Sequence, residues 1–549
     1  MPHLPDAQIK PAFEINKGNE RKSTMKQAKK IASILLALVM VFALAVPTFA
    51  ATVTVPSDGI LKDHTFTAYQ VFSGREENGV LSDVQWGNGI DSTAFLAALK
   101  ADTTYGSLFT DCTDAAAVAK VLGDNNTNTA LANAVAKLAY ANKTGTCTAL
   151  TSGENTLDDG YYLIVDTTAN VGEGGAYNTA LLQVVDNINI TVKTDAPTVE
   201  KKVLEDDKYN QDGGYGTGYN DVADYNMGDA VSFHLIGSVP DMSRYDTYKY
   251  IFHDTLSAGL TLNENSIKVY VASDKAGTDK AEITGWTKAV NGQPFTVSFT
   301  DLKTVSGVSR GKYIIVEYTA TLNQNAVVGL DGNPNVVYLE YSNKPDQSGS
   351  GDTNNTGKTP EDQVIVFTYE LDTTKVDGQD NSKKLEGAEF KLYTVDNKWA
   401  IVDSNNKVTG WADTEEGGST LTSDANGLFK VIGLDDGTYY LKETKAPTGY
   451  NLLSSKITVV ITATTTNGQI WIDGQASSAL TNLSVTADNT AGTGNTSTGI
   501  AGITVANNKG STLPETGGVG TPIFYIAGGV LAVAAAILLV TKKRMSKQG

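Results

Sequence analysis

The chain has 549 residues, and its 61 acidic against 43 basic side chains give a formal net charge of −18. This acidic balance argues against nucleic acid as a partner and favours a soluble extracellular surface. Four histidines and two cysteines leave little material for a transition-metal site, so we expect no metal and no cofactor.

The N-terminal part has the layout of a secretory signal peptide. In residues 25–50 a lysine-containing start precedes an apolar core from Ile31 to Val46 and a small-residue exit that ends at Ala50. An uncleaved membrane anchor is the alternative interpretation. Residues 1–24 precede a second possible start at Met25, so we assign residues 1–50 to the leader and signal peptide and expect export from the cell.

Most of the remaining chain alternates apolar and polar residues with a period of two, as in TFTAYQVF, VSFHLIG, YIIVEYTATL and KITVVITA. This alternation, broken by Gly, Asn and Asp turns, is typical of β-sandwiches. The sequence therefore predicts a mainly β protein with three tandem immunoglobulin-like domains, at residues 51–195, 196–350 and 363–510. The polar, Gly-rich stretch NKPDQSGSGDTNNTGKTPED is expected to separate the second domain from the third.

The first domain carries helices inserted into its β framework. DSTAFLAALK and TALANAVAKLAYANK are rich in alanine, and Leu131, Val135 and Leu138 have helical spacing. Cys112 and Cys147 form one disulfide or remain two free thiols, because their spacing fixes no geometry.

In the second domain, alternation in TVEKKV turns Lys201 inward and Lys202 outward. Asp254 follows Phe252 in YIFHDTLSAGL and is either an inward acid or an ordinary residue beside a turn. The last strand ends at Asn343, which we choose as the partner of Lys201. Asn335 has the same parity and stays open as the alternative.

The third domain places three polar side chains on inward faces. Lys375 shares parity with Leu371, Glu443 with Leu441, and Asn507 with Val505. An edge-strand glutamate that reaches solvent, or a buried Lys–Glu ion pair, would be the ordinary explanation. Parity and the short last strand make the neighbouring asparagines less suitable partners, namely Asn489 and Asn508.

A covalent bond explains these three residues together. Burial lowers the pKa of a lysine amine, and a neutral amine can attack a carboxamide. The same pocket is expected to keep Glu443 protonated, so that it polarises the Asn507 carboxamide. Fixed geometry can supply about 7–11 kcal/mol of the barrier. Ammonia would leave, and an amide would join the first strand to the last.

Residues 511–549 end the chain with a short motif, an apolar span and a basic tail. Pro522 to Val540 is long enough to cross a bilayer, and the cations that follow place the tail in the cytoplasm. This order resembles the cell-wall sorting signal of Gram-positive surface proteins. The resemblance implies that a sortase cleaves after the threonine and passes its carbonyl to an amine. The motif consists of Leu513, Pro514, Glu515, Thr516 and Gly517.

A second resemblance covers nearly the whole mature chain. From Tyr439 to Tyr450 the sequence matches the E-box of sortase-assembled pilins, Y-x-L-x-E-T-x-A-P-x-G-Y. The third domain resembles the B-type domain of collagen-adhesin-like proteins, and the second resembles the A-type domain. The resemblance implies intramolecular isopeptide bonds, with Glu443 and Asp254 as the catalytic acids.

The resemblance implies a structural rather than an enzymatic role. We expect the backbone subunit of a covalent pilus on the cell wall; an accessory pilin or a monomeric wall-anchored adhesin for a host ligand is the alternative. The joining lysine is expected at Lys193, although the Tyr-Pro that normally precedes it is replaced by Thr191-Val192; an ordinary solvated lysine is the other interpretation. The implied partners are identical subunits, pilin and housekeeping sortases, a peptidoglycan precursor, accessory pilins and a host surface.

Overall fold

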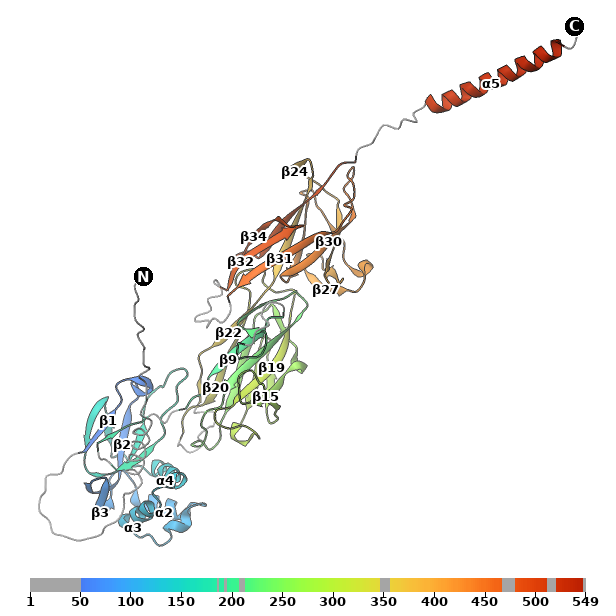
Figure 1. Cartoon of the computed structure of the whole chain (residues 1–549). Coiled ribbons are helices and arrows are strands. Elements are labelled where there is room, and N and C mark those ends of the chain that lie inside the picture. Colours follow the sequence, from blue (N-terminus) through green and yellow to red (C-terminus); the bar gives the residue numbers. More distant parts are fainter. Residues whose placement is uncertain are drawn as a thin grey trace, which may run out of the picture.

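A computed structural model describes residues 51–184, 187–191, 195–206, 213–345, 356–466, 479–510 and 520–546. These form three β-rich modules, arranged one after another, and a separate C-terminal helix (Figure 1). The predicted leader and signal peptide, the sorting motif Leu513–Gly517 and the predicted joining residue Lys193 lie outside the described residues.

The first module contains two small sheets and the three inserted helices. One sheet has the order β5-β1-β8 and the other β3-β2-β6-β7, with β4 paired to β2. The strands are β1 (Ala51–Val55), β2 (Phe66–Glu77), β3 (Val80–Trp86), β4 (Thr148–Leu150), β5 (Gly153–Leu157), β6 (Gly160–Asp166), β7 (Leu181–Val184) and β8 (Ile188–Asn189).

The predicted helices of this module are confirmed as α2 (Ser92–Ala101) and α4 (Thr129–Ala141), with α3 (Ala115–Asp124) between them. Each begins after an Asp or Asn whose side chain accepts a hydrogen bond from a first-turn backbone N–H, which stabilises a helix start. Leu131 and Val135 are buried in the module's core. Cys112 is buried and Cys147 exposed, and both thiols are free.

The second module is a sandwich of two seven-stranded sheets, with the orders β10-β9-β12-β19-β15-β16 and β11-β22-β20-β13-β18-β17. Beside these paths, β14 pairs with β19 and β21 with β20. The strands are β9 (Val199–Leu204), β10 (Tyr219–Asn220), β11 (Val222–Asp224), β12 (Ala230–Ser238), β13 (Tyr250–Leu256), β14 (Leu260–Leu262), β15 (Lys268–Ala272), β16 (Ala281–Glu282), β17 (Thr287–Val290), β18 (Pro294–Phe299), β19 (Tyr313–Leu322), β20 (Asn333–Ser342), β21 (Thr356–Lys358) and β22 (Asp362–Phe367).

The third module packs a five-stranded sheet, β24-β23-β35-β34 with β29, against an eight-stranded one, β27-β26-β25-β30-β31-β32-β33 with β28. The strands are β23 (Tyr369–Asp377), β24 (Asp380–Lys384), β25 (Glu389–Thr394), β26 (Trp399–Val402), β27 (Val408–Ala412), β28 (Leu421–Thr422), β29 (Leu428–Leu434), β30 (Gly437–Lys445), β31 (Ile457–Thr465), β32 (Leu480–Ala487), β33 (Thr490–Ala491), β34 (Thr493–Asn495) and β35 (Ile500–Asn507).

The predicted boundary between the second and third modules needs correction. Strand β22, expected at the start of the third module, pairs with β20 and β11 inside the second. The Gly-rich stretch is therefore not a boundary between modules, because β21 and β22 pair with β20 in the same sheet. Only Thr368 separates β22 from β23, so the chain passes into the third module within one residue.

The second and third modules share a continuous hydrophobic core. At their junction the Met227 amide donates to the Gly433 carbonyl at 2.9 Å, and the Gly329 amide donates to the Thr368 carbonyl at 3.2 Å. Gly433 has a φ of +91°, and a Cβ there would lie 2.4 Å from the side chain of Met227. A larger residue would therefore push the two modules apart.

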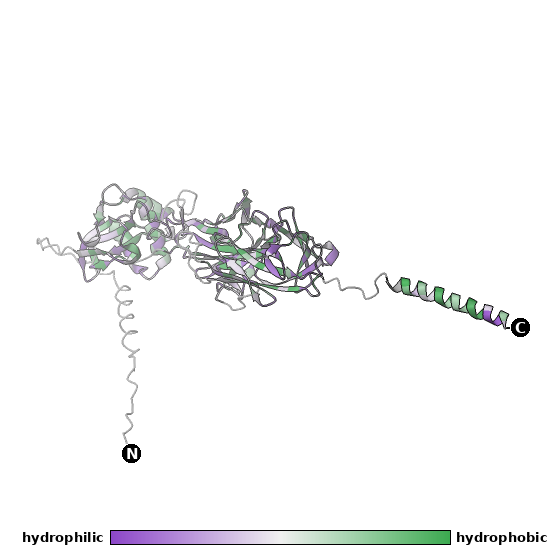
Figure 2. Cartoon of the chain, turned by 90° about the horizontal axis from the view of Figure 1, so that it is seen from above, coloured by the Kyte–Doolittle hydropathy of each residue, from purple (hydrophilic) through white to green (hydrophobic). Residues whose placement is uncertain are grey.

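The last described element is helix α5 (Gly520–Met545), of which Ile523–Met545 is long and apolar enough to cross a membrane. Its surface is apolar along most of its length and polar near the C-terminal end, where Lys542, Lys543 and Arg544 lie (Figure 2). The predicted C-terminal span is confirmed.

Candidate functional site

Lys375 lies in the core of the third module, where alternation predicts it. It belongs to β23, and its side chain is fully buried. β23 runs parallel to β35, with Lys375 opposite Val505 and Asp377 opposite Asn507. Lys375 and Asn507 therefore stand on one face of adjacent strands, two residues apart in register. The Lys375 Nζ donates to the Val505 carbonyl at 3.2 Å.

Glu443 approaches the same place from the opposite sheet. It lies in β30 and is 4% exposed. Both of its carboxylate oxygens accept from the Asn507 Nδ2 at 3.0 Å, and one also accepts from the Leu453 amide at 2.8 Å. The Asn507 Nδ2 donates further to the Asn451 carbonyl at 2.8 Å. These hydrogen bonds offset the cost of burying the carboxylate.

Two features of this cluster concern reactivity. Burial lowers the pKa of Lys375 to about 8, although the Glu443 charge opposes the shift, so a neutral amine is accessible near neutral pH. Among the described residues, the buried Asn507 Oδ1 has no hydrogen-bond partner. Glu443 contacts the amide nitrogen of Asn507 rather than this oxygen, which differs from the expectation that it polarises the carbonyl.

A second cluster is centred on Lys201 of β9. Its Nζ donates to Asp254 of β13, and at 2.9 Å to the hydroxyl of Tyr318 in β19. Tyr318 donates to the same Asp254 oxygen at 3.1 Å. Burial lowers the pKa of Lys201 and raises the pKa of Asp254, and in each case the partner's charge opposes the shift. The inward assignments of Lys201 and Asp254 agree with this arrangement.

The asparagine of this cluster is Asn335, not Asn343. Asn335 is fully buried, and its Nδ2 donates to the Tyr318 hydroxyl at 2.7 Å. Pairing of β20 with β13 places Val337 opposite Asp254, whereas Asn343 lies beyond the strand end, about 20 Å further along. The Asn343 carbonyl instead accepts from the Tyr177 amide of the first module at 2.9 Å. The structure therefore places the alternative, Asn335, in this cluster and the chosen Asn343 outside it, while the bond to Lys201 stays a prediction.

Sequence reasoning missed Tyr318, which links all three members of the second cluster. The only available signal was parity, because Tyr318 alternates with Val316 and Ala320 on an inward face. An aromatic residue at such a position reads as ordinary core. The role of the Asn451 carbonyl was also missed, since a backbone contact of this kind depends on the course of the loop after the E-box.

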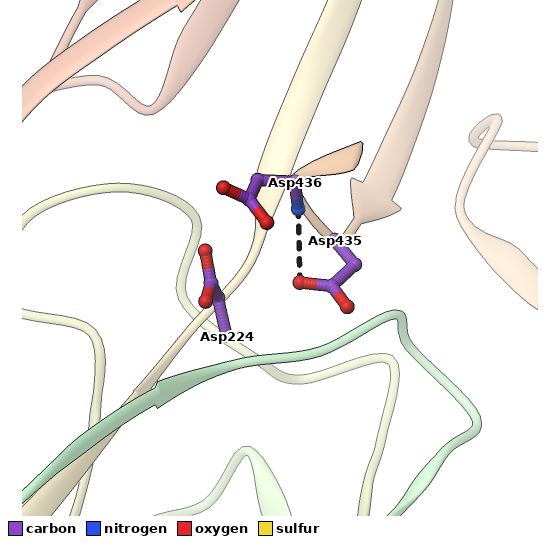
Figure 3. A group of neighbouring side chains, drawn as sticks. All are labelled: Asp224, Asp435 and Asp436. Atoms are coloured by element: carbon purple, nitrogen blue, oxygen red, sulfur yellow. Dashed lines mark hydrogen bonds between the residues drawn. The ribbon is translucent and has the colours of Figure 1, made fainter. Parts of the chain in front are cut away.

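An acidic cluster lies at the junction of the second and third modules (Figure 3). The cluster consists of Asp224 of β11 and of Asp435 and Asp436, which precede β30. One carboxylate oxygen of each residue lies within 4.8 Å of the other two. Asp224 accepts from the Tyr369 hydroxyl at 3.0 Å, and Asp436 accepts from the Ala463 amide at 3.1 Å. The Asp224–Tyr369 hydrogen bond ties the two modules together.

Comparison with known proteins identifies two segments. A family model described as SpaA, prealbumin-like fold domain, matches residues 369–475, and the LPXTG cell wall anchor motif matches residues 505–547. The trypsin-resistant surface T6 protein of Streptococcus pyogenes serotype M6 is 26% identical over 379 residues, which are 58% of this chain. The match spans 65% of the length of that relative.

Several solved structures are also similar. The pilus 2b backbone protein of group B streptococcus is 25% identical, with 53% of this chain and 97% of that chain covered and a TM-score of 0.40. The T6 backbone pilin of S. pyogenes is 19% identical, with 84% of this chain and 98% of that chain covered and a TM-score of 0.49. The major pilin SpaD of Corynebacterium diphtheriae is 17% identical, with 84% of this chain and 98% of that chain covered and a TM-score of 0.44.

The LPXTG match confirms the predicted sorting signal, and the prealbumin-like match agrees with the β fold of the third module. The LPXTG motif, together with the apolar helix that follows it, is that of a surface protein fixed to the cell wall after export. The chain is thus a cell-wall-anchored surface protein that carries a prealbumin-like SpaA domain and is homologous to the T6 surface protein.

Proposed function

We propose that this protein is the backbone subunit of a covalent pilus whose second and third modules are each closed by a self-formed Lys–Asn isopeptide bond. The observation that carries the proposal is that two modules of a wall-anchored chain each bury a lysine, a carboxyl group and an asparagine together. Buried lysines are rare, and their desolvation is costly. Conversion to an amide removes the buried charge and explains why both lysines lie in cores.

In the third module, the neutral Lys375 amine attacks the Asn507 carboxamide carbon. A nitrogen–carbon bond forms, the bond from that carbon to Nδ2 breaks, and ammonia leaves. Glu443 is in contact with the departing Nδ2, at 3.0 Å from both oxygens. It is thereby suited to carry a proton from the attacking amine to the leaving nitrogen. No separate enzyme is needed, because folding holds the reacting groups in place.

In the second module, Lys201 is the nucleophile and Asn335 the target. Asp254 and Tyr318 stand between them, with the Tyr318 hydroxyl in contact with all three groups. The raised pKa of Asp254 allows it to hold a proton, which it passes to the leaving nitrogen directly or through Tyr318. The reaction forms the Nζ–carbon bond and again releases ammonia.

Polymerisation is proposed to join Thr516 of one subunit to Lys193 of the next. A pilin sortase would hold Thr516 as a thioester after it releases Gly517, and the lysine amine would displace the enzyme. In the sequence, Lys193 follows the residues of β8 and precedes those of β9, the first strand of the second module. Joining one subunit's end to this boundary repeats a single contact along the fibre. A housekeeping sortase would transfer the last subunit to the peptidoglycan precursor.

The polymer is tested by immunoblotting a cell-wall extract after boiling in detergent. A ladder of high-mass bands is expected from the wild type, and Lys193→Ala should collapse it to one wall-anchored band. Lys100→Ala, an exposed lysine of the first module, is the matched control and should keep the ladder. A single band from the wild type would refute the backbone role and favour the monomeric adhesin. A persistent ladder in Lys193→Ala would move the joint to another lysine.

A further inference from the structure

A second buried lysine–carboxyl pair lies on the other face of β9. Lys202 follows Lys201 in β9, so its side chain points to the opposite face. Although sequence parity turns it outward, Lys202 is only 7% exposed. Its Nζ donates to Asp221, which is 2% exposed, and lies 4.7 Å from the ring centroid of Tyr215.

A third carboxyl group, that of Asp362, interacts electrostatically with both members of this pair. Asp362, at the start of β22, accepts from the Lys201 amide at 2.6 Å and from the Gln363 amide at 3.0 Å, which fixes it beside β9. Burial raises the pKa of Asp221, against the opposing charge of Lys202, and the charge of Asp362 raises it further. Burial likewise raises the pKa of Asp362. Both carboxyl groups therefore accept a proton more readily than an exposed aspartate does.

We propose that Lys202 and Asp221 condense into a third isopeptide bond, with Asp362 as the proton carrier. The ion pair first passes a proton from Nζ to the Asp221 carboxylate, which gives a neutral amine beside a neutral acid. Nζ then attacks the Asp221 carboxyl carbon, which lies one bond beyond the oxygen that it contacts. A nitrogen–carbon bond forms, and the bond from that carbon to the hydroxyl breaks. The hydroxyl leaves as water with a proton from Asp362, and the proton that the attacking nitrogen loses restores Asp362.

The geometry gives this bond a structural purpose different from that of the Lys201 bond. β9 is the first strand of its module, and β10 is its short antiparallel neighbour at the sheet edge. The bond would close a loop of about 20 residues and fasten the β10–β11 segment over the outer face of β9. Lys201 would tie the same strand to the opposite sheet. Adjacent lysines would thus hold one strand from both of its faces.

The released small molecule separates this bond from those of the proposed function. Formation of a Lys–Asn bond lowers the mass of the chain by one ammonia, whereas formation of the Lys202–Asp221 bond lowers it by one water. The full chain, expressed in a sortase-deficient strain and purified from the membrane, should lack two ammonia and one water by high-resolution intact mass. Peptide mapping should find a branched peptide in which Lys202 carries Asp221.

Lys202→Arg keeps the positive charge and the ion pair but cannot form the bond. The intact mass of this variant should therefore lack two ammonia but no water. Lys201→Arg is the matched variant and should regain one ammonia while the water loss remains. A wild-type mass that lacks only ammonia, with Lys202 in an unbranched peptide, overturns the inference and leaves an ordinary buried ion pair. A mass that lacks only water would overturn the Lys–Asn bonds instead.

Discussion

Replacing Glu443 with glutamine removes the proton carrier of the third module while preserving the side chain's shape. The cross-link would join β23 to β35 and close a loop of about 130 residues. Without it, the unfolded chain has more conformational entropy, which destabilises the folded module. The chain-entropy relation for a loop of that size gives about 5 kcal/mol. For a module of this length, such a change lowers the melting temperature by about 15 °C.

The assay is intact mass followed by differential scanning calorimetry on the full ectodomain. The intact mass of Glu443→Gln should be higher by one ammonia than expected for the bonded chain, and its melting temperature should fall by the amount given above. Glu386→Gln, at an exposed position of the same module, should change neither quantity. If Glu443→Gln retains the ammonia loss, Glu443 is not needed for the bond. If the wild type has its full unmodified mass in this module, the covalent explanation of the buried lysine is refuted.

Three further outcomes are expected. Asn335→Ala should restore one ammonia to the second module by intact mass, whereas Asn343→Ala should not; the reverse result would reinstate the sequence-based choice. In Asn507→Ala, Lys375 stays a free amine whose folded pKa of about 8 lies below its unfolded value of about 10.4, so the unfolded state binds more protons between these limits. Urea unfolding should then show stability rising by about 3 kcal/mol from pH 8 to pH 10.4, a rise that the bonded wild type lacks; equal slopes would contradict bonding of this lysine. Gly433→Ala should lower the free energy of unfolding, obtained from urea titration, by more than the roughly 1 kcal/mol cost of a positive φ, because its Cβ also contacts a side chain of the second module. An unchanged urea midpoint would argue against a tight junction.

Much of the third module's site could be predicted because alternation determines which face a strand residue occupies. That rule alone places Lys375, Glu443 and Asn507 inward, and the structure brings the last two into hydrogen-bond contact beside the first. The covalent bond among them stays a prediction. Their convergence reflects the parallel pairing of β23 with β35, which links residues far apart in sequence.

Parity could not choose between asparagines on one strand. Asn335 and Asn343 have the same parity, and only the register of β20 against β13 decides which one lies in the cluster around Tyr318. The domain boundary at residue 363 failed for a related reason. A Gly-rich stretch signals that the chain leaves a sheet, but the return of β22 to that sheet depends on long-range pairing with β20.

The single-residue step at Thr368 has a consequence for the shape of the proposed fibre under lateral load. The second and third modules share one hydrophobic core and are joined by backbone hydrogen bonds across their junction. They should therefore move together as one rigid unit. The contacts between the first and second modules that the structure describes include backbone bonds such as those of Gly174 and Tyr177, with no apolar cluster in common. Within each subunit, compliance should therefore concentrate at the boundary where Lys193 is expected to receive its neighbour, so that the fibre would flex beside its covalent joints.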